Sequence, residues 1–232
     1  MTERRFVCLA ALCLLGASCK PAPSASTLGQ PSDGDTLVLP EPTPSATPVL
    51  RALAKRHTSR DYATQRLPPD VVANLLWAAD GVNRPETGGR TAPSAHDWRY
   101  MDILVFDSSG VYRYDPPTHG VERLFTRDLR AITGYQELAA IAPLSLVYVA
   151  DEAKMQTKSA DEIRLFGDAS AGTIAQNVYL FAAESGLNTG VRADIDRRQL
   201  HAALGLASSQ RIVLAQSVGY APSGDAAPPL QH

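Results

Sequence analysis

Hydrophobic positions in the middle of the chain repeat with the periods of helices and strands. Pro68-Pro69-Asp70 marks a helix start, and the apolar residues that follow share one face until Gly81, namely Val71, Val72, Leu75, Leu76 and Ala79. A short helix is expected just before, over residues 49–55. Runs of β-branched and aromatic residues between turn residues or charges predict strands over 101–107, 144–150 and 211–218.

The longest predicted element is a helix that begins at Ser159, where Glu162 completes a capping box, and ends at Gly186. One face carries Ile163, Phe166, Ile174, Val178 and Phe181, and other faces carry Ala169, Ala171, Ala175 and Leu180. We therefore expect this helix to be buried nearly all round, within the chain or against a partner subunit. The pattern predicts an α+β fold in which helices pack on a largely antiparallel sheet around a central buried helix.

The N-terminus has the pattern of an export signal. A basic start, residues 1–5, precedes an apolar run over 6–15 that is too short to span a bilayer, which needs about 20 residues. Gly16-Ala17-Ser18 then precedes Cys19, an order that resembles a bacterial lipoprotein cleavage box. We expect a signal peptide over 1–18, lipidation at Cys19 and anchoring at the periplasmic side of the bacterial cell envelope, with simple cleavage as the alternative.

Composition divides the rest of the chain. Residues 19–48 are rich in Pro, Ser, Thr and Ala and are predicted to form a tether, and 223–232 a disordered tail, which leaves one domain over 49–222. The three cysteines, Cys8, Cys13 and Cys19, all lie in the signal and its cleavage site, so no disulfide is expected. The formal net charge of −2 gives no basic field for nucleic acid.

Several chemistries are disfavoured by the motifs. The histidines show no paired spacing, so no metal site is predicted. The sequence has no Gly-x-Ser-x-Gly elbow, phosphate-loop lysine motif or Gly-x-Gly-x-x-Gly turn, which argues against hydrolase, nucleotidase and Rossmann functions.

In contrast, the segment from Arg56 to Arg60 places two guanidinium groups and two hydroxyls within five residues. Such a group is suited to a phosphate monoester, although a basic turn of this kind is more often a solvated surface loop.

The segments around this cluster resemble the nitroreductase family in order. Arg56-His57-Thr58-Ser59-Arg60-Asp61-Tyr62 is similar to its N-terminal FMN signature, and Leu75–Ala79 to the end of its next helix. Thr91–Trp98 resembles its Ala-Pro-Ser loop, and Arg90–Ser94 looks closest to the branch with peptide-heterocycle dehydrogenases. Later segments, 175–180, 184–188 and 218–220, are similar to its buried helix, that helix's exit and its closing strand.

The resemblance implies a homodimer that binds FMN at sites built from two subunits. Carried over by residue, Arg56 and Arg60 would bind the phosphate and ribityl end, with a hydroxyl from Thr58 and backbone from His57. Ser94 and Asp97 would lie by the flavin ring. Backbone N–H groups of Arg192, Ala193 and Asp194 would lie near the flavin N5 edge, and Arg192 would offset charge on the reduced ring.

Three positions depart from the family pattern. Asp97 replaces the usual Asn, Arg99 stands where Gln is common, and Gly219-Tyr220 is followed by no further cation. We expect a flavoprotein that transfers hydride from NAD(P)H to an unidentified small-molecule acceptor by a ping-pong mechanism, with solvent supplying protons and no catalytic side chain assigned. Two alternatives stay open: a flavin-dependent peptide or azoline dehydrogenase, and a non-catalytic lipoprotein that retains the fold.

Overall fold

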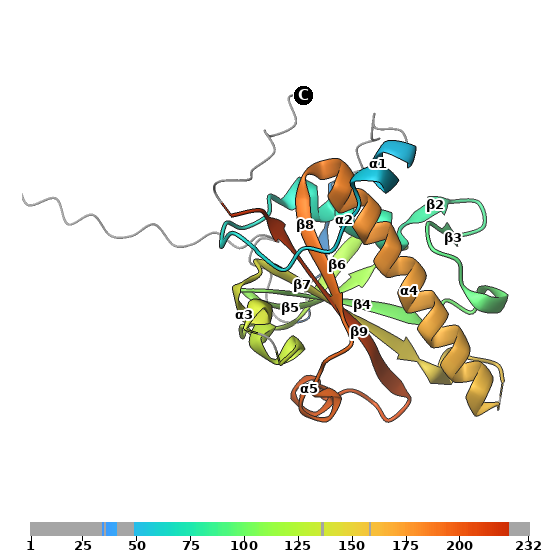
Figure 1. Ribbon diagram of the computed structural model, residues 1–232. Helices are drawn as coiled ribbons and strands as arrows, with labels where there is room; N and C mark the ends of the chain where they lie inside the picture. Colours follow the sequence, from blue (N-terminus) through green and yellow to red (C-terminus); the bar gives the residue numbers. More distant parts are fainter. Residues whose placement is uncertain (1–33, 35, 41–48, 136, 158, 223–232) are drawn as a thin grey trace, which may run out of the picture.

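The computed structural model describes residues 34, 36–40, 49–135, 137–157 and 159–222 (Figure 1). The predicted signal peptide, the Cys19 lipidation site and the tail over 223–232 lie outside the described residues. The helices are α1 (Val49–Lys55), α2 (Pro69–Asp80), α3 (Leu138–Ile141), α4 (Ala160–Ser185) and α5 (Arg197–Leu204), with short 3₁₀ helices η1 (Ala95–Asp97), η2 (Arg130–Thr133) and η3 (Glu152–Lys154). In the described part of the chain, no helix combines the length and apolarity needed to cross a membrane.

A seven-stranded sheet in the order β1-β6-β5-β4-β7-β9-β8 forms the centre of the fold, and every neighbouring pair in it is antiparallel. Its strands are β1 (Thr36–Val38), β4 (Met101–Asp107), β5 (Gly110–Asp115), β6 (Gly120–Phe125), β7 (Leu144–Asp151), β8 (Leu187–Arg192) and β9 (Gln210–Tyr220). A separate hairpin pairs β2 (Val82–Arg84) with β3 (Gly89–Arg90). The expected α+β fold with an antiparallel sheet is confirmed.

Local signals place the two main helices as expected. Pro69 stands in the first turn of α2 and Gly81 follows its last residue. At α4, the Ser159 hydroxyl accepts a hydrogen bond from the Glu162 backbone N–H, and Gly186 ends the helix in the left-handed region at φ 68°. The Glu162 carboxylate accepts from the Thr157 hydroxyl, so only half of the predicted capping box forms with Ser159.

The sheet lies between two hydrophobic layers. On one face, α4 runs diagonally across β4, β7, β8 and β9, with α2 packed beside it (Figure 1). A core cluster that includes Val72, Leu76, Tyr148 and Ile174 fills the space between these helices and the sheet. The other face carries a smaller cluster around Phe106, with α5 and η2 as its cover. The edge strand β8 also contacts α4, and it ends at Arg192, one of the predicted cofactor residues.

One expectation becomes narrower and another needs correction. Within the chain α4 is buried on one side only, since Leu165 is 63% exposed and Ala169, Gly172 and Gln176 also face solvent, so burial all round would require a partner subunit. Small and apolar residues on the outer face thus do not imply burial within one chain. The predicted tether over 19–48 includes residues 36–38, which form β1 on β6, because the apolar run ends in Leu39, a buried core residue.

Candidate functional site

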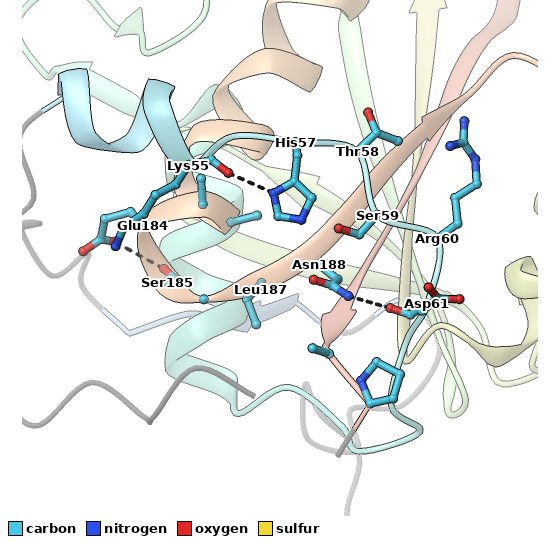
Figure 2. A pocket seen from close by; sticks show the side chains of 15 residues that line it. Lys55, His57, Thr58, Ser59, Arg60, Asp61, Glu184, Ser185, Leu187 and Asn188 are labelled. Atoms are coloured by element: carbon cyan, nitrogen blue, oxygen red, sulfur yellow. Dashed lines mark hydrogen bonds between the residues drawn. The ribbon is translucent and has the colours of Figure 1, made fainter. Parts of the chain in front are cut away.

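Residues 56–62 form an extended arm between α1 and α2, and the arm presents alternate side chains to opposite sides. Figure 2 shows Thr58 and Arg60 pointing away from His57, as expected from the two-residue period of an extended backbone. Arg56 belongs to the side of Thr58, since both contact Tyr179 of α4. The structure therefore brings together three of the predicted phosphate ligands, Arg56, Thr58 and Arg60, on one side of the arm.

The arm is held along the outer edge of β8. The Ser59 backbone N–H donates to the Thr189 carbonyl at 2.9 Å, and the Tyr62 hydroxyl donates to the Ser59 carbonyl at 2.8 Å. Burial raises the pKa of Tyr62 to about 12, so this hydroxyl stays protonated as a donor. A Cβ on Gly190 would lie only 2.7 Å from the Ser59 carbonyl oxygen, so the close approach of arm and strand requires glycine.

Tyr179 supports the arm from below. Its ring lies under the Arg56 guanidinium, with 5.3 Å from Cζ to the ring centroid. Its hydroxyl is 2.9 Å from the Thr58 hydroxyl and accepts from the Val191 backbone N–H at 3.0 Å. Sequence reasoning missed Tyr179 as a functional residue. The available signal was a tyrosine within an otherwise apolar helix face, because a buried tyrosine hydroxyl needs a partner.

A cleft of about 970 Å³ opens beside the arm, between it and the turn from α4 to β8. His57 points into it, and the opposite wall includes Glu184, Leu187 and Asn188 (Figure 2). His57 is oriented by its Nδ1, which lies 2.9 Å from the Lys55 carbonyl oxygen. Thr58 and Arg60 also line this cleft, although their side chains point away from that of His57.

Arg192 is buried in the last position of β8, with 5% of its surface exposed. Its guanidinium donates to the Ser217 hydroxyl at 2.9 Å and to the Thr133 hydroxyl at 3.0 Å, and its Nε has no partner among the described residues. Desolvation lowers its pKa, as expected for a cation in the protein interior. Arg192 is therefore a cation of the protein interior and not a solvated surface charge. Ala193 and Asp194, which follow it, are exposed.

Residues 133–135 lie beside Arg192 and Asp194, which sequence reasoning did not anticipate. Thr133 receives the Arg192 hydrogen bond, and the Tyr135 backbone N–H donates to the Asp194 carbonyl at 3.4 Å. Tyr135 itself is 65% exposed. No local pattern in the sequence could reveal this contact, because about sixty residues separate its two sides.

Ser94 and Asp97 lie in a second group, on the loop that contains η1. The Ser94 hydroxyl accepts from the Arg99 backbone N–H at 2.9 Å, and the Arg99 guanidinium holds both oxygens of Asp97 at 3.0 and 2.6 Å. These hydrogen bonds hold the pKa of Asp97 below its usual value. His96, Asp97 and Arg99 have left-handed φ angles of 52°, 56° and 53°, which brings Arg99 back onto Asp97.

The two groups are far apart in one chain. The η1 loop packs on Phe166, whose ring is 5.8 Å from His96 and 6.0 Å from Trp98, whereas the arm packs on Tyr179. Thirteen residues of α4 separate these contacts, which amounts to about 20 Å along the helix axis. Ser94 and Asp97 therefore do not join Arg56 and Arg60 within a single chain. Within the described residues, no group of His, Cys, Asp and Glu is arranged to hold a metal ion.

Comparisons with known proteins agree on one family. A model described as the nitroreductase family matches residues 53–220. The protein MJ1384 of Methanocaldococcus jannaschii, named as a nitroreductase, is 30% identical over 166 residues, 67% of this chain and 83% of that protein. A solved structure from Ralstonia eutropha JMP134, also named as a nitroreductase, has a TM-score of 0.78 at 41% identity. The match covers 81% of this chain and 90% of the Ralstonia chain.

A more distant structure shares the fold. The NADPH:FMN oxidoreductase of Vibrio harveyi, solved with NAD⁺, has a TM-score of 0.56 at 18% identity over 78% of this chain and 72% of that one.

Proposed function

Because the chain belongs to the nitroreductase family, we propose that it binds FMN and passes hydride from NAD(P)H to a small-molecule acceptor. Membership of the family identifies it as an oxidoreductase. The observation that best supports FMN binding is the placement of Arg56, Thr58 and Arg60 on one side of a fixed arm. The likeness in fold to an oxidoreductase named for NADPH and FMN supports the same proposal.

The residues of the arm fit a phosphate monoester. None of the ion pairs among the described residues involves Arg56 or Arg60. Neither guanidinium group is therefore paired with a carboxylate, and both can bind an anionic ligand. Arg192 adds a buried cation on β8 that forms no ion pair among the described residues, which favours a ligand that gains negative charge on reduction.

When bound, FMN supplies the acceptance and donation of hydride. Arg56, Thr58 and Arg60 would hold the phosphate, and Arg192 would supply a positive charge to the reduced ring. We propose ping-pong turnover, in which the oxidised nicotinamide leaves before the acceptor binds and solvent supplies protons. The acceptor, and the choice between NADH and NADPH, stay open.

A second copy of the chain would complete the site. About 20 Å of α4 separates Ser94 and Asp97 from the arm, so one chain cannot place both groups on the same flavin ring. Exposed apolar side chains lie on the outer faces of α4 and α1, namely Leu165, Val49, Leu50 and Leu53. We propose that these faces form a homodimer in which Ser94 and Asp97 of one copy approach the arm of the other.

Titration of the apo-protein with FMN tests the proposal through quenching of flavin fluorescence. Saturable binding at one FMN per chain is expected, and replacing Arg56 and Arg60 together by Ala should abolish it. Arg198→Ala is the matched control, because this exposed arginine lies on α5 at the other face of the sheet. A wild-type protein that takes up no FMN would support the non-catalytic alternative.

Two further experiments address the finer predictions. Reduction of bound flavin by a peptide without NAD(P)H would favour the peptide dehydrogenase alternative. For localisation, we propose export and anchoring through an acyl group on Cys19. Cys19→Ala should release the protein from the membrane fraction of the native host, and an unchanged distribution would contradict anchoring at this residue.

A further inference from the structure

The Tyr179 hydroxyl connects two parts of the site that are far apart in sequence. It lies 2.9 Å from the Thr58 hydroxyl on the arm and 3.0 Å from the Val191 backbone nitrogen on β8. Tyr179 is 8% exposed, so water does not easily replace these partners. Its position depends on α4, whose buried side also includes Ala175 and Val178.

The chemistry of the three groups suggests one direction for the hydrogen bonds. The Val191 N–H can only donate, so the Tyr179 oxygen is an acceptor in that contact. The Tyr179 hydroxyl then donates its proton to the Thr58 oxygen, which leaves the Thr58 proton free to be donated to an acceptor outside this pair. A phosphate oxygen is such an acceptor, and a chain of aligned hydrogen bonds strengthens each of its members.

The same contacts fix the arm relative to the strand edge. The Thr189 carbonyl accepts from Ser59, and the Val191 N–H donates to Tyr179, so both groups point to the side of β8 that β9 does not occupy. Tyr179 and Ser59 therefore hold the arm against β8 at two positions of the same strand edge, Val191 and Thr189.

We propose that Tyr179 is a positioning residue that directs the Thr58 hydroxyl toward the phosphate and thereby makes the site prefer FMN over riboflavin. The inference rests on the proposed function and deepens it. Tyr179 acts through Thr58 and β8 rather than by touching the cofactor. Riboflavin lacks the phosphate, so it gains nothing from this orientation.

The test compares the affinities of FMN and riboflavin for the apo-protein, measured by fluorescence titration. Tyr179→Phe keeps the ring under Arg56 and removes only the hydroxyl. FMN affinity should fall about tenfold, whereas riboflavin affinity should change less than about twofold. Tyr114→Phe is the matched control. Tyr114 lies on the remote strand β5, and its hydroxyl is hydrogen-bonded to His119, so the variant removes another tyrosine hydroxyl and should leave the ratio unchanged.

Thr58→Val provides a second variant that does not depend on the folding of Tyr179→Phe, because Thr58 is exposed. It should lower the FMN to riboflavin ratio by a similar factor, and the double variant should lose little more than either single one. Equal losses for both flavins, or additive effects, would overturn the inference and leave the proposed function intact. A wild-type chain that binds neither flavin would overturn the proposed function itself, and this inference with it.

Discussion

Replacing Gly190 by Ala tests the close contact between the arm and β8. The added Cβ would lie 2.7 Å from the Ser59 carbonyl oxygen, 3.3 Å from the Tyr62 hydroxyl and 3.4 Å from Thr58 Cγ2. An ordinary contact begins at 3.4 Å, so the arm must retreat by about 0.7 Å, the difference between 3.4 and 2.7 Å. Overpacking of this kind costs about 1–3 kcal/mol, and the retreat also weakens the 2.9 Å hydrogen bond from Ser59 to Thr189.

Urea unfolding of the apo-protein, followed by circular dichroism, should therefore show a loss of about 1–3 kcal/mol in the free energy of unfolding. FMN affinity should fall as well, because Arg56 and Thr58 move with the arm. Arg198→Ala, an exposed position on α5 at the other face of the sheet, is the control and should leave stability and FMN affinity unchanged. Unchanged stability and affinity in Gly190→Ala would refute the argument.

Three other predictions follow from burial and charge. Burial raises the pKa of Asp80 from 3.8 to about 7, so the folded state binds this proton more tightly and stability should decrease as pH rises from about 4 to 7. Asp80→Asn should flatten this dependence in urea midpoints measured at pH 5 and 8, and an unaltered slope would exclude Asp80 as its source. Leu165→Glu should shift the protein toward monomer in analytical ultracentrifugation, whereas Ile141→Glu, another exposed position, should not. Arg192→Met should make the midpoint potential of bound FMN more negative in spectroelectrochemical titration, and an unchanged potential would place this cation out of reach of the flavin.

Local signals in the sequence were enough to predict the main elements. Pro69, Ser159 and Gly186 act through the backbone within one helical turn, so α2 and α4 begin and end as expected. The short strands β1, β5 and β6 were not predicted, because β1 has only three residues and the six-residue strands β5 and β6 include charged residues, so each carries little periodic signal. The sequence left open whether the chain itself or a partner subunit covers the outer face of α4, since small residues fit a buried face and a contact surface equally well.

The candidate site likewise has one part that the sequence indicated and another that it did not. The cluster of Arg56, Thr58 and Arg60 was recognisable because these residues are close in sequence, but the segment was expected to be a turn and is extended instead. The contacts that orient it come from Tyr179 and Gly190, more than a hundred residues later. Such pairs depend on how β8 and α4 pack, which hydrophobic periodicity does not specify.

The course of the arm along β8 also bears on how the protein avoids self-association. An edge strand offers unpaired backbone groups to any extended chain, which is a route to aggregation. Here Ser59 occupies the Thr189 carbonyl and a tyrosine side chain occupies the Val191 N–H. The segment that carries the proposed phosphate ligands thus also blocks the end of the sheet against a foreign strand, so variants that loosen it should precipitate more readily as well as bind flavin more weakly.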